Sequence, residues 1–293
     1  MARYRNLIMP VFLNRLVFLL LCLSSISCAT ITPDQIASEP DLTTPVRFLL
    51  TFDDGPGVYT DMDGKYPTLH ILDQLKNNPY QPGIKAVFFV QTRNSNGGGS
   101  ELGKQYIKRE YREGHLVCLH IASKKGHISY TSMSADELDQ SLENGKQDIF
   151  HLTGEIPSCV RPTFWKFNSR VVSAFNKHQL KMVLTDINAR DGVIYVFNVS
   201  FRRRSHFNHW LYQIRKKMLQ KELPVVDGVV PIIVTFHDPN VFTAHHMTEY
   251  LEILMTESRN VRLPVSSQPF YNDRVKIKEA LSRRPFNQGP YEF

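Results

Sequence analysis

Short apolar runs alternate with amphipathic segments along most of this chain of 293 residues. The runs have the length of buried β-strands, whereas the segments between them place apolar residues at helical spacing. Strands are predicted at residues 46–52, 85–90, 115–120, 158–161, 181–186, 193–198 and 231–237. Alternating strands and helices predict an α/β fold with a parallel sheet, either open or closed into a barrel. About seven strands in this length favour a distorted (β/α) barrel that is similar to a TIM barrel.

Each predicted helix carries one apolar face. Leu69, Leu72 and Leu75 mark the first helix. Ser134 and Glu137 form a capping box that predicts where another helix begins. Further helices are predicted around residues 171–175, 210–219 and 243–255.

The ends of the chain differ from its middle. Arginines, a short apolar run at residues 16–23 and small residues before Cys28 predict a signal peptide over residues 1–28, and therefore an exported protein. The run is too short to span a bilayer. Three locations of the exported protein remain open: the periplasm, the membrane surface through a lipid on Cys28, or the outside of the cell after secretion. A linker is predicted over residues 29–45, one folded domain over 46–270 and a charged C-terminal tail over 271–293.

The composition is that of an ordinary globular protein, with 42% hydrophobic residues and a net charge of +7. Basic residues cluster locally, as in segments 202–204 and 215–217, which is typical of a solvated face. Because no nucleic-acid-binding motif accompanies these clusters, we predict no nucleic-acid partner. No pattern in the sequence predicts an oligomeric state.

Two cysteines, Cys118 and Cys159, fall in the predicted domain. Each precedes a polar residue at the end of a strand by two positions, so both side chains are expected to face inward on nearby strands. An exported protein could pair them, but small buried thiols are the interpretation that we favour.

Polar residues collect at the C-terminal ends of the predicted strands. Asp53 and Asp54 follow an apolar strand, and a Gly-Pro pair breaks the chain directly after them. This bend lets both carboxylates reach one pocket, where one binds a cation and the other handles a proton; a solvated acidic turn is the alternative. The other strand ends carry His120, Arg161, residues 186–191, and His237 with Asp238. In a parallel α/β barrel these ends share the face that forms the active site.

Five segments of the chain form a recognisable series. They are residues 51–56 (TFDDGP), 86–90 (AVFFV), 161–168 (RPTFWKFN), 188–191 (NARD) and 235–238 (TFHD). In this order they resemble the motifs of the polysaccharide deacetylases, the NodB-homology group known as carbohydrate esterase family 4. The resemblance covers roughly residues 46–265.

The resemblance implies a metal-dependent hydrolase that removes acetyl groups from a glycan. Asp54 would bind a divalent metal, for which zinc is predicted, together with histidines of the second motif. Asp53 would be the general base, and Arg161 would orient it. His237 would protonate the leaving amine, with Asp191 supporting its imidazolium form.

The third motif supplies two more candidate residues. By family analogy, the backbone N–H of Phe164 would stabilise the oxyanion. Trp165 stands where the family often has Gly, so it either rebuilds a wall that contacts the sugar or joins the core.

The second motif departs from the family pattern. His120 fits the first metal histidine, but the position four residues later is Lys124. The next histidine, His127, is seven residues along, which in a regular helix corresponds to about 10.5 Å of rise, too far for one ion. Either a loop containing Gly126 folds back and brings His127 to the metal, or fewer protein ligands bind the metal, or no metal is bound.

The leading hypothesis is an exported deacetylase that hydrolyses N-acetyl, rather than O-acetyl, groups of a cell-envelope or extracellular glycan such as peptidoglycan or a chitin-like oligosaccharide. The alternative is a glycan-binding relative that keeps the fold and has lost the metal. Retention of a base, its orienting arginine and an acid–carboxylate pair favours the enzyme. An envelope scaffold would leave these residues unexplained.

Overall fold

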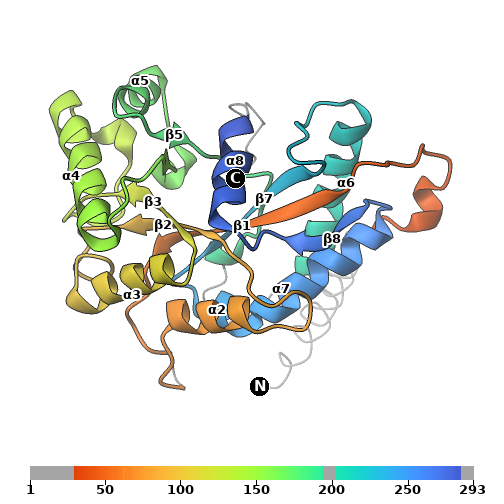
Figure 1. Ribbon diagram of the computed structural model, residues 1–293, viewed down its shortest axis with the longest axis horizontal. Helices are drawn as coiled ribbons and strands as arrows, with labels where there is room; N and C mark the ends of the chain where they lie inside the picture. Colours follow the sequence, from red (N-terminus) through yellow and green to blue (C-terminus); the bar gives the residue numbers. More distant parts are fainter. Residues whose placement is uncertain (1–29, 62, 194–201, 285–293) are drawn as a thin grey trace, which may run out of the picture. The chain divides into compact units, whose positions relative to one another are not determined.

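A curled parallel sheet forms the centre of the computed structural model, which describes residues 30–61, 63–193 and 202–284 (Figure 1). Seven strands pair in the order β5-β4-β3-β2-β1-β7-β6, and β8 pairs with β1. The strands are β1 (Val46–Gly55), β2 (Val87–Gln91), β3 (Leu116–Ile121), β4 (Cys159–Val160), β5 (Lys181–Met182), β6 (Ile187–Asn188), β7 (Val230–His237) and β8 (Val265–Phe270). All of these pairings are parallel, and together the seven strands form a half barrel that confirms the predicted α/β fold.

Helices surround this sheet (Figure 1). They are α2 (Pro67–Lys76), α3 (Glu101–Arg112), α4 (Ala135–Thr153), α5 (Ser169–Lys177), α6 (Arg203–Leu219), α7 (Val241–Asn260) and α8 (Arg274–Arg283). The predicted capping box begins α4, with the Glu137 N–H 3.1 Å from Ser134 Oγ and the Ser134 N–H 2.9 Å from Glu137 Oε2. Among the described residues, no helix is both long and apolar enough to cross a membrane.

Alternation along the strands separates two apolar cores. Phe48, Leu50 and Phe52 of β1 belong to the larger core, which includes buried residues of α2 and α7. Leu49 belongs to the smaller core together with inward residues of the neighbouring strands and the buried side of α8. The inward positions that follow Leu49 are Thr51 and Asp53, so the inside of the half barrel changes from apolar to polar towards the C-terminal ends of the strands.

Cys118 and Cys159 lie in the smaller core, as expected from their inward register. The structure joins them in a disulfide between β3 and β4, with their Cα atoms 5.3 Å apart. The expectation of two free thiols was therefore wrong. Paired neighbouring strands bring the two cysteines to a bonding distance.

Replacing both cysteines by Ala is expected to lower the free energy of unfolding by about 4 kcal/mol. The disulfide closes a loop with a sequence separation of 41, which restricts the unfolded chain. Urea unfolding of the oxidised wild type and of the double variant measures the difference. A loss below about 1 kcal/mol would contradict the expected constraint.

The segment predicted as a linker packs against the domain from residue 31 onwards. Ile36 is buried, and Asn208 of α6 binds the backbone N–H and C=O of Ile31 at 2.8 and 2.9 Å. The fully buried Arg215 reaches Glu39 at 3.1 Å. Partners distant in sequence thus order a stretch whose own composition is polar.

Other differences from the predicted elements also reflect long-range contacts. The predicted tail contains α8, whose Ile277 and Leu281 are buried in the smaller core. Helix α3 and strands β6 and β8 were not predicted. Of the strand predicted at 181–186, only the first two residues form a strand, β5. Of the strand predicted at 193–198, only Val193 is described, and it ends a 3-10 helix (Asp191–Val193).

Glu110 of α3 is fully buried, and neither of its carboxylate oxygens has a hydrogen-bond partner among the described residues. Burial, followed by repulsion from Asp238, raises the pKa of Glu110 well above its usual value. The folded state therefore holds a proton that the unfolded state releases above pH of about 4.3, and this costs stability as pH rises towards the folded-state pKa. Glu110→Gln should gain stability relative to wild type between pH 5 and pH 8, as measured by thermal unfolding. The exposed Glu101→Gln is the matched control, and an equal difference at both pH values would contradict the prediction.

Candidate active site

The predicted site residues meet at the C-terminal ends of the parallel strands. Asp53 and Asp54 lie near the end of β1 and His120 near the end of β3, while Arg161 directly follows β4. His237 is the last residue of β7. The fold thus brings to one edge residues that are far apart in the sequence.

Backbone geometry lets the two adjacent aspartates act in the same place. Asp54 has a left-handed φ of 68°, and the pairing of β1 with β2 is irregular between Phe52 and Gly55. The strand alternation that would send the Asp53 and Asp54 side chains to opposite faces is therefore interrupted at Asp54. The backbone therefore bends at Asp54, one residue before the Gly-Pro pair at which the bend was predicted.

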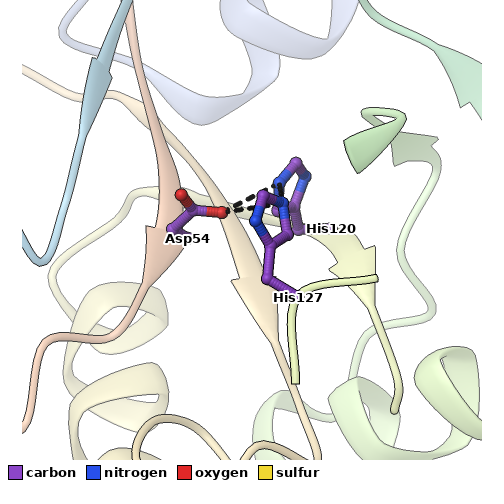
Figure 2. Close-up of side chains that lie close together, drawn as sticks. All are labelled: Asp54, His120 and His127. Atoms are coloured by element: carbon purple, nitrogen blue, oxygen red, sulfur yellow. Dashed lines mark hydrogen bonds and ion pairs between the residues drawn. The ribbon is translucent and has the colours of Figure 1, made fainter. Parts of the chain in front are cut away.

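Asp54, His120 and His127 converge on one point (Figure 2). Asp54 Oδ1 is 3.1 Å from His120 Nε2 and 3.2 Å from His127 Nε2, and the two nitrogens are 3.2 Å apart. Gly126 has a φ of +79°, a conformation that suits Gly and turns the loop before His127. The loop therefore brings His127 to His120 despite the seven-residue spacing.

The chemistry of these three groups fits a cation. Asp54 Oδ1 is buried and has no hydrogen-bond partner among the described residues. His120 Nδ1 lies 3.0 Å from the carbonyl oxygen of Arg161, which assigns the proton to Nδ1 and directs the lone pair of Nε2 towards Asp54. Ligands about 2.0–2.1 Å from a tetrahedral zinc ion would be roughly 3.3 Å apart, close to the observed separations.

The protonation states agree with this arrangement. Burial opposes ionisation of Asp54, but its interactions with the nearby imidazoles of His120, His127 and His237 hold the pKa of Asp54 well below its usual value. Burial lowers the pKa of His127. A charged carboxylate and a neutral imidazole are the forms that bind a metal.

A second group of potential ligands, Asp61, Asp63 and His245, has a different arrangement. Asp61 Oδ1 accepts the N–H groups of Asp63 and Lys65 at 2.9 and 2.7 Å, and Asp61 Oδ2 lies 2.7 Å from His245 Nε2. Both carboxylate oxygens of Asp61 therefore already have hydrogen-bond partners, unlike Asp54 Oδ1.

Arg161 is fully buried and is fixed on every side. Its Nη1 donates to Asp53 Oδ1 and to Thr51 Oγ1, both at 2.7 Å. Its Nε and Nη2 donate to the carbonyl oxygens of Val183 and Leu184 at 3.1 and 3.3 Å, where the chain runs from β5 towards β6. Asp53 is thereby held in one orientation.

Trp165 belongs to this same arrangement. The Arg161 guanidinium lies 5.1 Å from the centre of the Trp165 ring and 4.1 Å from that of Phe89. Trp165 is partly buried against the larger core. Of its two predicted roles, packing in the core is therefore the one that its contacts favour.

His237 and Asp191 form a second pair. Asp191 Oδ1 lies 2.7 Å from His237 Nδ1, and Asp191 Oδ2 accepts from the backbone N–H of His237 at 2.7 Å. Although burial lowers the pKa of His237, Asp191 raises it, aided by Asp54 and Asp53, to about 10. The imidazole is therefore charged at neutral pH.

Sequence reasoning missed two hydroxyl groups that support these pairs. Thr243 of α7 donates to Asp191 Oδ2 at 2.6 Å, and Thr51 accepts from Arg161. Thr51 lies in the first motif, but nothing in the sequence near Thr243 indicates its contact. Asp186 pairs with Arg284. Asp238 is buried beside the site, where its N–H donates to the Asp53 carbonyl oxygen at 2.9 Å and its carboxylate lies against Gly55.

The chain is similar to known proteins in sequence over about half of its length. Residues 43–183 match the sequence profile of a family described as polysaccharide deacetylase. A peptidoglycan-N-acetylglucosamine deacetylase of Listeria monocytogenes is 30% identical over 137 residues, 47% of this chain and 25% of the relative. A chitin deacetylase of a Pestalotiopsis species is 26% identical over 149 residues, 51% of this chain and 44% of the relative. The chain thus spans less than half the length of these relatives.

Two solved structures share the fold. A chitin deacetylase from Colletotrichum lindemuthianum superposes with a TM-score of 0.56 at 20% identity, covering 79% of this chain and 93% of that one. A family 4 carbohydrate esterase from Streptomyces lividans, in complex with acetate, gives a TM-score of 0.52 at 19% identity, with 73% and 91% covered. At these identities the similarity concerns the fold.

Proposed function

Because this chain belongs to the polysaccharide deacetylase family, carbohydrate esterase family 4, we propose that it is a metal-dependent hydrolase of N-acetyl groups on a glycan. The observation that carries the proposal is the convergence of Asp54 Oδ1 with the Nε2 atoms of His120 and His127, at 3.1 and 3.2 Å. Asp54 Oδ1 is buried without a hydrogen-bond partner among the described residues, and a cation bound between it and the two imidazole nitrogens would supply one.

Asp54, His120 and His127 would hold a divalent metal, and we propose zinc because two imidazoles and a carboxylate suit it. Three protein ligands leave a position open, so the bound metal would supply Lewis acidity to a water molecule and to the acetyl carbonyl. Hydrogen bonding of His120 Nδ1 to the Arg161 carbonyl keeps the Nε2 lone pair turned inward.

Asp53 is proposed as the general base. It uses Oδ1 for the hydrogen bond to Arg161, which leaves Oδ2 to accept a proton from the attacking water. The oxygen of this water forms a bond to the acetyl carbon. The backbone N–H of Phe164 is proposed to donate to the resulting oxyanion.

His237 is proposed as the general acid. Its Nδ1 is engaged by Asp191, so Nε2 is the atom that delivers a proton to the leaving nitrogen. As the C–N bond breaks, the amine takes this proton and acetate departs with the oxygen of water. Asp191 stabilises the charged imidazole before the transfer and keeps its tautomer fixed.

The names of the matched relatives support an acetylated glycan, such as peptidoglycan or a chitin-like oligosaccharide, as the substrate. Hydrolysis of O-acetyl groups is the less favoured variant. The glycan-binding alternative depended on loss of the second metal histidine, and the position of His127 argues against it. We also propose that the protein is exported, with or without an N-terminal lipid. The signal peptide predicted over residues 1–28 lies outside the described residues.

The test is the metal content of the purified protein together with acetate release from chitooligosaccharides and peptidoglycan in the presence of Zn²⁺. Binding at micromolar zinc with release of one acetate per free amine formed is the expected result. Absence of metal binding together with absence of acetate from either glycan would overturn the proposal.

A further inference from the structure

Among the described residues, His127 has no counterpart of the hydrogen bond that orients His120. Histidines that bind metals usually donate their other ring N–H to an oxygen, which fixes the ring. His120 does so through Nδ1 and the Arg161 carbonyl oxygen at 3.0 Å. Within the described part of the chain, the hydrogen bonds and ion pairs of His127 involve Nε2 alone. Another contact must therefore orient its ring.

The loop that carries His127 is fixed at its backbone. Tyr130 Oη donates to the carbonyl oxygen of His120 at 2.8 Å, and Thr163 Oγ1 donates to that of Ile128 at 2.7 Å. These bonds tie the loop to β3 and to the segment after β4. Neither bond involves the His127 side chain, whose ring lies 5.1 Å from the His120 ring and closer to that of Phe164.

The Phe164 ring supplies the missing restraint. It stacks on the His127 ring with centroids 4.2 Å apart and an angle of 29° between the planes. Phe164 has a φ of +55°, a left-handed conformation that costs a bulky residue roughly 1–2 kcal/mol, and 47% of its surface is exposed. A strained and half-exposed Phe at this position requires a reason other than burial, and the stack provides one.

We propose that Phe164 is a positioning residue for His127. Its ring keeps the imidazole plane fixed so that Nε2 stays directed at Asp54, and it takes the part that the hydrogen bond to the Arg161 carbonyl oxygen has for His120. The inference rests on the proposed function, since it assigns His127 to the metal, and it adds a side-chain role to a residue proposed above to act through its backbone.

The first test needs no metal. In the metal-free protein, the ring current of Phe164 should shift the ring protons of His127 upfield in the NMR spectrum. Phe164→Leu should abolish this shift, whereas Phe164→Tyr should preserve it. Phe167→Leu, at an exposed aromatic of the same segment, is the control that should leave it in place.

The second test is zinc affinity, measured by competition with a chromogenic chelator. Phe164→Leu should weaken binding roughly tenfold, the lower end of the effect of losing an orienting partner. Phe164→Tyr should bind as wild type does, and so should Phe167→Leu. Equal affinities of Phe164→Leu and wild type would overturn the positioning role and leave the proposed function intact. A wild type that binds no zinc would overturn both, even where the ring-current shift is found.

Discussion

Replacement of Asp53 by Asn is expected to lower kcat for deacetylation by about 10²–10⁴-fold while zinc remains bound. This is the range that a positioned general base contributes. The Asn side chain keeps an oxygen for Arg161, and the guanidinium retains Thr51 and two carbonyl oxygens as partners. The variant should therefore fold with its metal ligands in place. Acetate release under saturating substrate and zinc content per chain are the two measurements.

Two controls separate a lost base from a disturbed site. Asp53→Asn should bind zinc with the affinity of the wild type, because Asp54, His120 and His127 are unchanged. The unfolding temperature of the variant, compared with that of the wild type, shows whether the completely buried Arg161 keeps its stabilising contacts. A kcat within tenfold of the wild type, with zinc bound, would remove Asp53 from the role of base.

The central strands could be predicted because their apolar runs are buried on both faces. Strands β1 and β7 are almost entirely buried, and a local pattern is sufficient to identify such strands. Strand β8 contains Ser266, Ser267 and Gln268, and two of these are exposed, so its sequence resembles a loop. Half of the residues of helix α8 are charged, and its place in the domain depends on the packing of its apolar side on the inside of the half barrel.

The candidate site was predictable in its residues more than in its geometry. The motifs named Asp53, Asp54 and Arg161 and the pair of His237 and Asp191, since each lies at or after the end of a predicted strand. The path of the loop that carries His127 depends on Thr163, 35 residues from its partner Ile128, and spacing alone carries no information about such a contact. The disulfide was missed for the same reason, because the pairing of β3 with β4 determines the distance between the cysteines.

Replacement of His127 by Ala is expected to remove zinc binding at micromolar concentrations and deacetylase activity with it. The loss in affinity should exceed the roughly 10–100-fold that follows loss of an outer partner, because a direct ligand is removed and Asp54 Oδ1 keeps only one facing imidazole. Zinc content after dialysis and acetate release measure the two effects. His245→Ala, in the second Asp–His group, is the matched control and should retain both.

A double variant distinguishes the geometry of this chain from the usual spacing of the family. If the segment after β3 were helical, Lys124→His would place an imidazole four residues after His120 and restore zinc binding to His127→Ala. In the structure Lys124 is exposed and lies in an irregular loop that turns at Gly126 before it reaches the site. The added histidine should therefore leave the double variant without zinc. Recovery of zinc binding would show that this loop can rearrange into a helix-like turn, and that the fold-back of His127 is one of two accessible arrangements.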